Sequence, residues 1–190
     1  MVLSLTTEIR VPSAAAVAKV AAAVEASDHE LMIAVRAGEI GRLGELFERH
    51  HQRLYGFFVR LTNQPTVSED LVQIVFYRIL KYRHTYRDEG KFTAWIYHLA
   101  RKVAADHFRK HAAAPAATDP VDLLAHPDAA LARLPLEHRE VLVLSRLQNV
   151  EHKEIARLLD TTVGAVKVRV HRALKELRTV YFRIRRDQAA

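Results

Sequence analysis

Residues 153–178 read KEIARLLDTTVGAVKVRVHRALKELR, and this stretch predicts two short amphipathic helices joined by a break at residues 160–162. Thr162 is a suitable N-cap for the second helix, because its hydroxyl can accept a hydrogen bond from a backbone N–H of the first turn. The stretch is therefore either an ordinary helical hairpin or a helix-turn-helix unit that enters the major groove of DNA.

The second of these helices is expected to have one apolar and one basic face. The apolar face contains Val166, Val170, Ala173, Leu174 and Leu177. We assign the opposite face to duplex DNA, and its residues are Ala165, Lys167, Val168, Arg169, His171, Arg172 and Lys175. Small residues let the backbone approach the bases, while Lys and Arg reach base edges and phosphates. This pattern favours a DNA-reading unit over a hairpin with a solvated basic face.

The composition is consistent with a polyanionic partner. The chain has 190 residues, 49% of them hydrophobic, and a formal net charge of +7. The positive charge suits either nucleic acid or an anionic membrane surface. The absence of cysteine excludes a disulfide scaffold and a thiolate zinc site. We find neither a membrane-spanning run nor a signal peptide, and we expect a cytoplasmic protein.

The rest of the sequence predicts helices and no strand, so we expect an all-α fold of two small helical domains joined by a linker. Residues 1–26 form an extension that is poorly ordered or weakly helical, and residues 27–111 form a helical bundle. An Ala-, Pro- and Asp-containing linker spans residues 112–127, and the helix-turn-helix domain spans residues 128–190. Ser27 and Glu30 have the spacing of a capping box, and Gly38 can end that first helix.

Two helices of the bundle carry further candidate surfaces. On the helix expected at residues 91–110, Tyr97, Arg101 and Phe108 lie on one side, with Lys102 and Arg109 at its edge. Aromatic rings between cations suit unstacked bases, although aromatic residues on a helix are more often core. On the helix expected at residues 69–81, Asp70, Gln73 and Tyr77 lie off the apolar stripe, where they either dock a protein or are solvated.

We expect no metal, no cofactor and no enzymatic activity. His107 and His111 have i, i+4 spacing and His50 is followed by His51, but neither pair has a carboxylate in a recognisable ligand pattern. The sequence contains no phosphate-binding glycine loop and no nucleophile motif. Two rival classes stay open: a helix-turn-helix regulator that is not a polymerase subunit, and a basic helical protein that binds membranes.

Three stretches, in this order, resemble bacterial sigma factors of the sigma-70 family, in the extracytoplasmic-function (ECF) branch. They are SEDLVQIVFYRILKYR at 68–83, GKFTAWIYHLARKVAADHFRK at 90–110 and LPLEHREVLVLSRLQNVEHKEIARLLDTTVGAVKVRVHRALKELR at 134–178. The resemblance implies a region 2 bundle and a region 4 helix-turn-helix domain. It implies a factor that binds core RNA polymerase and directs it to specific promoters, often under the control of an anti-sigma factor.

The resemblance also implies a role for each surface. The polymerase would bind Asp70, Gln73 and Tyr77. The minus-10 element would be recognised and opened by region 2, through Arg87, Lys91, Tyr97, Arg101, Lys102, Phe108 and Arg109. The minus-35 element would be read by the basic face of residues 163–178, in region 4. Three positions depart from the family: Ile74 replaces an acid, Lys102 replaces a common Asn, and Asn149 replaces a frequent Gly.

Overall fold

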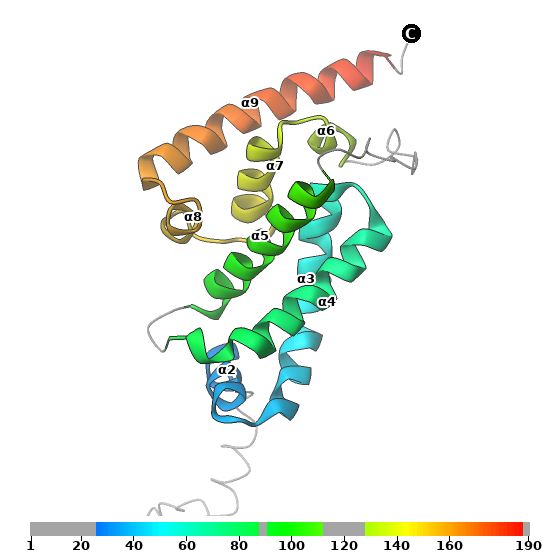
Figure 1. Cartoon of the computed structure of the whole chain (residues 1–190). Helices are drawn as coiled ribbons and strands as arrows, with labels where there is room; N and C mark the ends of the chain where they lie inside the picture. The colour runs from blue at the N-terminus through cyan, green and yellow to red at the C-terminus, as the bar shows by residue number, and fades with distance from the viewer. Residues whose placement is uncertain (1–25, 88–90, 112–127, 188–190) are drawn as a thin grey trace, which may run out of the picture.

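The computed structural model describes residues 26–87, 91–111 and 128–187, and every regular element within these ranges is a helix (Figure 1). The N-terminal unit contains α2 (Asp28–Ala37), α3 (Leu43–Thr62), α4 (Pro65–Tyr82) and α5 (Phe92–His111), with 3-10 turns η1 (Ile40–Arg42) and η2 (Arg83–Thr85). The C-terminal unit contains α6 (Ala129–Ala132), α7 (Leu136–Leu142), the π-helical stretch η4 (Val143–Leu147), α8 (His152–Leu158) and α9 (Val163–Asp187). The all-α expectation is confirmed. The expected extension, apart from Ala26, and the expected linker lie outside the described residues.

Helix α2 begins and ends as its sequence predicts. The Glu30 N–H donates to Ser27 Oγ at 3.2 Å, and the Ser27 N–H donates to Glu30 Oε2 at 2.7 Å, which completes the capping box. The Ser27 N–H, together with the Ser27 hydroxyl, which donates to the same Oε2 at 2.8 Å, holds the pKa of Glu30 below its usual value. At the other end, Gly38 has φ 112°, a left-handed conformation that glycine adopts without strain. Local chemistry therefore fixes both ends of this helix.

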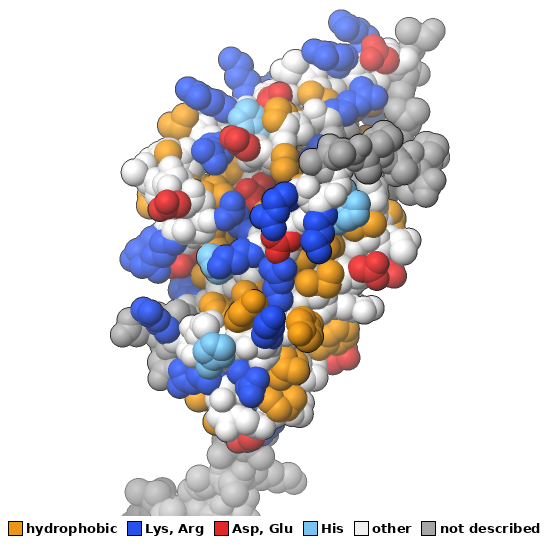
Figure 2. All heavy atoms as spheres, viewed as in Figure 1, with side chains coloured by type: hydrophobic (Ala, Val, Ile, Leu, Met, Phe, Trp, Pro, Cys, Tyr) orange, Lys and Arg blue, Asp and Glu red, His pale blue; other side chains and the backbone are white. Residues whose placement is uncertain are grey.

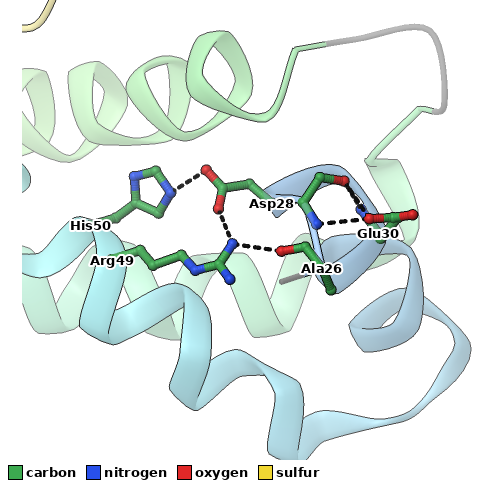
Figure 3. A network of polar contacts seen from close by, with 6 residues as sticks. Ala26, Asp28, Glu30, Arg49 and His50 are labelled. Atoms are coloured by element: carbon green, nitrogen blue, oxygen red, sulfur yellow. Dashed lines mark hydrogen bonds and ion pairs between the residues drawn. The ribbon is translucent and has the colours of Figure 1, made fainter. Parts of the chain in front are cut away.

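A polar network then fixes the start of α2 against α3 (Figure 3). Asp28 accepts from Arg49 Nη1 at 3.0 Å and lies 2.7 Å from His50 Nε2. Arg49 Nη1 also donates to the Ala26 carbonyl at 2.7 Å. His50 is buried and its ring packs against Phe92 of α5, with centroids 5.0 Å apart. The adjacent residues His50 and His51 therefore have different environments, because His50 lies in the core and takes part in this polar network.

The helix-turn-helix of the C-terminal unit is made by α8 and α9. Thr162 Oγ1 accepts the Ala165 N–H at 3.1 Å, so the predicted cap is present. Val166, Val170 and Ala173 are buried against the rest of the unit. Leu174, which we expected on the same face, is instead 37% exposed and lies outside the buried stripe. At the far end of α9, Ile184 packs on Ala129 and Ala130 of α6.

The two units pack against each other. Helix α5 lies beside α8, and α3 contacts α6, α7 and η4 (Figure 1). Buried apolar residues of both units form one continuous cluster. This arrangement decides which faces of the N-terminal unit remain accessible.

Candidate nucleic-acid and polymerase interfaces

The outer face of α9 is accessible and basic. Of the residues assigned to duplex DNA, Lys167, Val168, His171, Arg172 and Lys175 are exposed, while Ala165 and Arg169 are half-buried. Val168 is 50% exposed in the middle of this face. The structure therefore brings all seven predicted residues onto one helix, with the small Ala165 in its first turn. A helix of this kind can present donors to base edges and phosphates.

The acid on this helix closest to the basic face is engaged elsewhere. Glu176 Oε2 lies 2.5 Å from His138 Nδ1 of α7, so its carboxylate is already paired with a side chain of another helix. Before the helix-turn-helix, Asn149 has φ 53°, and in the break Asp160 has φ 48°. Both are left-handed positions, which Asn and Asp tolerate better than most residues. The replacement of a frequent Gly by Asn149 thus leaves the turn intact.

One face of α4 is also accessible. Asp70, Gln73 and Tyr77 are all exposed, Tyr77 to 63%. Ile74, which stands where the family usually has an acid, lies among them and is 39% exposed. These residues form the α4 face, which combines a carboxylate, an amide and apolar surface. Such a mixture is typical of protein interfaces rather than of nucleic-acid interfaces.

A groove adjoins the α4 face and was not expected from the sequence. It has a volume of about 570 Å³, and it is lined by Phe47, His51, Gln52, Tyr55, Glu69, Val72 and Gln73. Gln73 belongs to both the groove and the α4 face. The sequence feature that could have indicated this groove is the row of aromatic residues on α3. Helical spacing alone assigns such residues to the core.

The aromatic-basic face expected on α5 is not open in this structure. Tyr97 is only 3% exposed, and its hydroxyl donates to Gln148 Oε1 of the C-terminal unit at 2.6 Å. Burial raises the pKa of Tyr97 far above its usual value. Gln148 Nε2 in turn donates to the Arg53 carbonyl of α3 at 3.2 Å. The expectation that Tyr97 lies on a solvent-facing surface is therefore wrong for this arrangement.

Arg101 is engaged by the same unit. Its Nε donates to Glu140 Oε1 at 2.7 Å, and its Nη1 donates to the Leu158 carbonyl of α8. Phe108 is half-buried and packs against the core. Sequence spacing could not reveal these partners, since Gln148 is 51 positions from Tyr97 and Glu140 is 39 positions from Arg101.

The other cations assigned to the minus-10 element are exposed: Arg87, Lys91, Lys102 and Arg109. Figure 2 shows Lys and Arg side chains gathered in a band across this face, over α5 and its neighbours. Two of the four are paired, because Lys91 Nζ contacts Glu151 and Arg109 Nη2 lies 2.6 Å from Asp106. Exposed pairs of this kind are weak and leave the cations available to phosphates.

Features of a metal site or of a membrane span are absent from the described residues. These residues contain no group of three or more His, Cys, Asp or Glu side chains that could hold a metal ion. The His107 and His111 rings stack with centroids 4.4 Å apart, and burial together with His111 lowers the pKa of His107. No helix in this part of the chain is long and apolar enough to cross a membrane.

Comparisons with known proteins match both units. Residues 46–114 match the model of sigma-70 region 2, and residues 128–177 match that of sigma-70 region 4. The RNA polymerase sigma factor CarQ of Myxococcus xanthus is 31% identical over 158 residues, which is 75% of this chain and 91% of CarQ. The ECF RNA polymerase sigma factor SigX of Bacillus subtilis is 30% identical over 155 residues, 70% of this chain and 80% of SigX. CnrH, solved in complex with the cytosolic domain of CnrY, superposes with a TM-score of 0.68 at 25% identity, covering 81% of this chain and 96% of that one.

Proposed function

We propose a division of labour between the two units, from the premise that this chain belongs to the ECF branch of the sigma-70 family. It is a promoter-directing subunit of RNA polymerase, whose partners are the core enzyme and promoter DNA. In this proposal α9 reads the minus-35 element, α5 and the segment before it act on the minus-10 element, and α4 docks on the polymerase. The function needs no catalytic residue, because the polymerase supplies the chemistry, and it is exerted in the cytoplasm, where the polymerase and the chromosome meet.

The observation that carries the proposal is the outer face of α9. It combines a capped N-terminus, a small residue in the first turn and a run of exposed cations, while its nearby acid is bound to His138. The cations supply attraction to phosphates, and the small Ala165 in the first turn lets the helix approach the base edges. We assign sequence discrimination to Arg172 and Lys175, and phosphate contacts to the flanking Lys167 and Arg169.

The α4 face is proposed as the polymerase contact. Asp70 and Gln73 offer an acceptor and an amide, and exposed Tyr77 and Ile74 add apolar area beside them. The adjoining groove of about 570 Å³ enlarges this surface toward α3. Aromatic side chains next to a few polar groups are the usual composition of a strong protein interface. An apolar Ile74 in place of an acid makes this contact depend less on salt.

The minus-10 role of α5 rests on its cations and on its rings. Lys91, Lys102 and Arg109 are exposed and can hold the phosphates of a separated strand. Tyr97 and Phe108 supply rings that can stack on unpaired bases once they are accessible. An anti-sigma factor is the proposed regulatory partner, and the related CnrH was solved in complex with the cytosolic domain of CnrY.

Reconstitution with core polymerase tests the proposed function. The chain should confer specific initiation on core enzyme in run-off transcription from a genomic library, and the active templates should share two spaced elements. Changing Arg172→Ala together with Lys175→Ala should weaken use of these promoters, since loss of one good base contact costs roughly 1–3 kcal/mol. The same variant should bind core polymerase normally, because α4 is unchanged.

The matched control removes two cations from the same helix. Arg185→Ala with Arg186→Ala changes the charge equally, but both residues are exposed and lie beyond the region 4 match, which ends at residue 177. This control should retain promoter choice. Equal loss of promoter use in both variants would show that only net charge matters. A chain that represses or activates transcription without binding core enzyme would support the alternative of a helix-turn-helix regulator.

A further inference from the structure

We propose that Val168 of α9 determines part of the promoter specificity by contacting the methyl group of a thymine in the minus-35 element. This role rests on the proposed function of α9 as the helix that reads the minus-35 element. It adds a base that the helix recognises through apolar contact, without a hydrogen bond. Arg172 and Lys175, to which we assign polar discrimination, read other bases of the same element.

Val168 is an apolar side chain in the middle of a basic surface. It is 50% exposed, and its neighbours one helical turn further along the outer face are His171 and Arg172. A single exposed apolar residue is common on protein surfaces and needs no explanation by itself. The place of Val168 at the centre of the face assigned to duplex DNA is what indicates a ligand with an apolar feature.

The residues before Val168 leave it prominent. Gly164 and Ala165 occupy the same face in the first turn of α9, and neither has a side chain beyond Cβ. A duplex that approaches this end of the helix therefore reaches Val168 without obstruction. Because α9 begins at Val163, Val168 lies in its second turn. Residues near the N-terminus of a helix in the major groove are the ones that meet base edges.

The major groove offers one apolar feature to such a side chain. Every base pair presents hydrogen-bond donors or acceptors there, but only a pair that contains thymine also presents a methyl group, on C5 of that base. The side chain of Val168 has neither a donor nor an acceptor, so it cannot read the polar atoms. Contact between its methyl groups and the thymine methyl removes apolar area of both from water, which is favourable.

A protein partner is the rival occupant of this position, and the surrounding charges disfavour it. The outer face around Val168 carries Lys167, Arg172 and Lys175, all of them exposed. Lys is depleted in the core of protein interfaces. Lys and Arg are instead the residues that hold phosphates and guanine edges. The α4 face, with its mixture of carboxylate, amide and apolar groups, shows the contrasting composition.

The test deletes the thymine methyl without changing base pairing. The full chain is assembled with core polymerase, and the probe is a promoter fragment found by run-off transcription. Each thymine of its minus-35 element, on either strand, is replaced in turn by deoxyuridine, which lacks only the C5 methyl. We expect one position at which this change weakens binding about three- to five-fold, as loss of one buried methyl group does.

Val168→Ala removes the protein side of the same contact. The variant holoenzyme should bind the unmodified promoter about three- to five-fold more weakly than wild type, and deoxyuridine at the sensitive position should weaken it no further. The charge of α9 is unchanged, so the dependence of affinity on salt concentration should match that of wild type. The buried stripe of α9 is also unchanged, and far-UV circular dichroism verifies that the helix is intact.

Val163→Ala is the matched control. Val163 is likewise an exposed valine of α9, at 37%, but it lies about 140° around the helix from Val168. The substitution therefore removes the same two methyl groups from the same helix, away from the outer face. We expect its holoenzyme to keep the full sensitivity to deoxyuridine.

A converse experiment adds a methyl group to another base. Replacing the sensitive thymine–adenine pair by cytosine–guanine should weaken binding, and 5-methylcytosine should then restore part of the affinity. Its methyl group occupies the same C5 position in the major groove, while its polar atoms remain those of cytosine. The gain should be about three- to five-fold for wild type and absent for Val168→Ala.

Two results would overturn the role of Val168. One is that no thymine of the element is sensitive to loss of its methyl group in the wild-type holoenzyme. The other is a sensitivity that persists unchanged in Val168→Ala. In both cases the holoenzyme still prefers its promoter. Failure of the proposed function is distinguishable, because the wild-type holoenzyme would then bind the unmodified promoter and one with a scrambled minus-35 element equally well.

Discussion

Asp106 and Arg78 join α5 to α4 through one ion pair, with Arg78 Nη2 2.5 Å from Asp106 Oδ2. The hydrogen bond from Arg78 holds the pKa of Asp106 below its usual value of 3.8, and the charges of Arg78 and Arg109 act in the same direction. Because the folded pKa is lower than the unfolded one, the pair stabilises the fold above pH 3.8, and this stabilisation is lost as the pH falls through the folded pKa.

The contribution of Asp106 to the stability of the fold should therefore depend on pH. Asp106→Asn should lower the melting temperature near neutral pH, and the difference from wild type should shrink as the pH falls below about 4. Thermal unfolding followed by circular dichroism at a series of pH values measures it. Glu48→Gln, an exposed change of equal charge on α3, should show no such trend. A difference that stays constant down to acid pH would mean that Asp106 acts through shape rather than charge.

At the scale of the element, α9 depends on its cap. The Ala165 N–H has Thr162 Oγ1 as its acceptor, and Thr162→Ala removes that acceptor. We expect a loss of about 1 kcal/mol in the free energy of unfolding, measured by urea denaturation, and weaker binding of a minus-35 duplex. Thr162→Ser keeps the hydroxyl and should behave like wild type. Equal stability of the Ala and Ser variants would contradict the role of the cap.

Elements of this chain could be predicted from the sequence where the determining residues are close together. The cap at Thr162, the capping box at Ser27 and the end of α2 at Gly38 depend on residues within one turn, and all three are present. The outer face of α9 followed from helical spacing in the same way. The covering of Tyr97 could not be predicted, because it depends on Gln148 in another unit, and spacing does not tell a buried ring from a base-binding one.

At the scale of the whole molecule, Arg139 holds three segments together. Its guanidinium donates to the carbonyls of Leu61 in α3, of Ala132 and of Leu134, and burial lowers its pKa. One side chain thus joins the end of α3 to the start of the C-terminal unit. An arginine suits this position, because its planar fork can donate in several directions at once.

Replacing this arginine should weaken both the C-terminal unit and its contact with the N-terminal unit. Arg139→Met leaves three carbonyls without a donor, and we expect a loss of about 2–4 kcal/mol in the free energy of unfolding. Urea denaturation measures the effect, with circular dichroism following the helices of both units together and the fluorescence of Trp95 in α5 following the N-terminal unit. Arg133→Met, at a neighbouring exposed position, is the control and should change little. Unchanged stability of the Arg139 variant would show that water replaces the guanidinium.

The contacts of Tyr97 with Gln148 and of Arg101 with Glu140 also limit which parts of related proteins can be exchanged. Each contact has one residue on either side of the join between the units. A hybrid that combines this N-terminal unit with the C-terminal unit of a relative inherits only half of each pair. The packing of its two units against each other would then differ from that of either parent, even with both DNA-reading helices intact. Hybrids that switch promoter preference faithfully should therefore carry positions 140 and 148 along with positions 97 and 101.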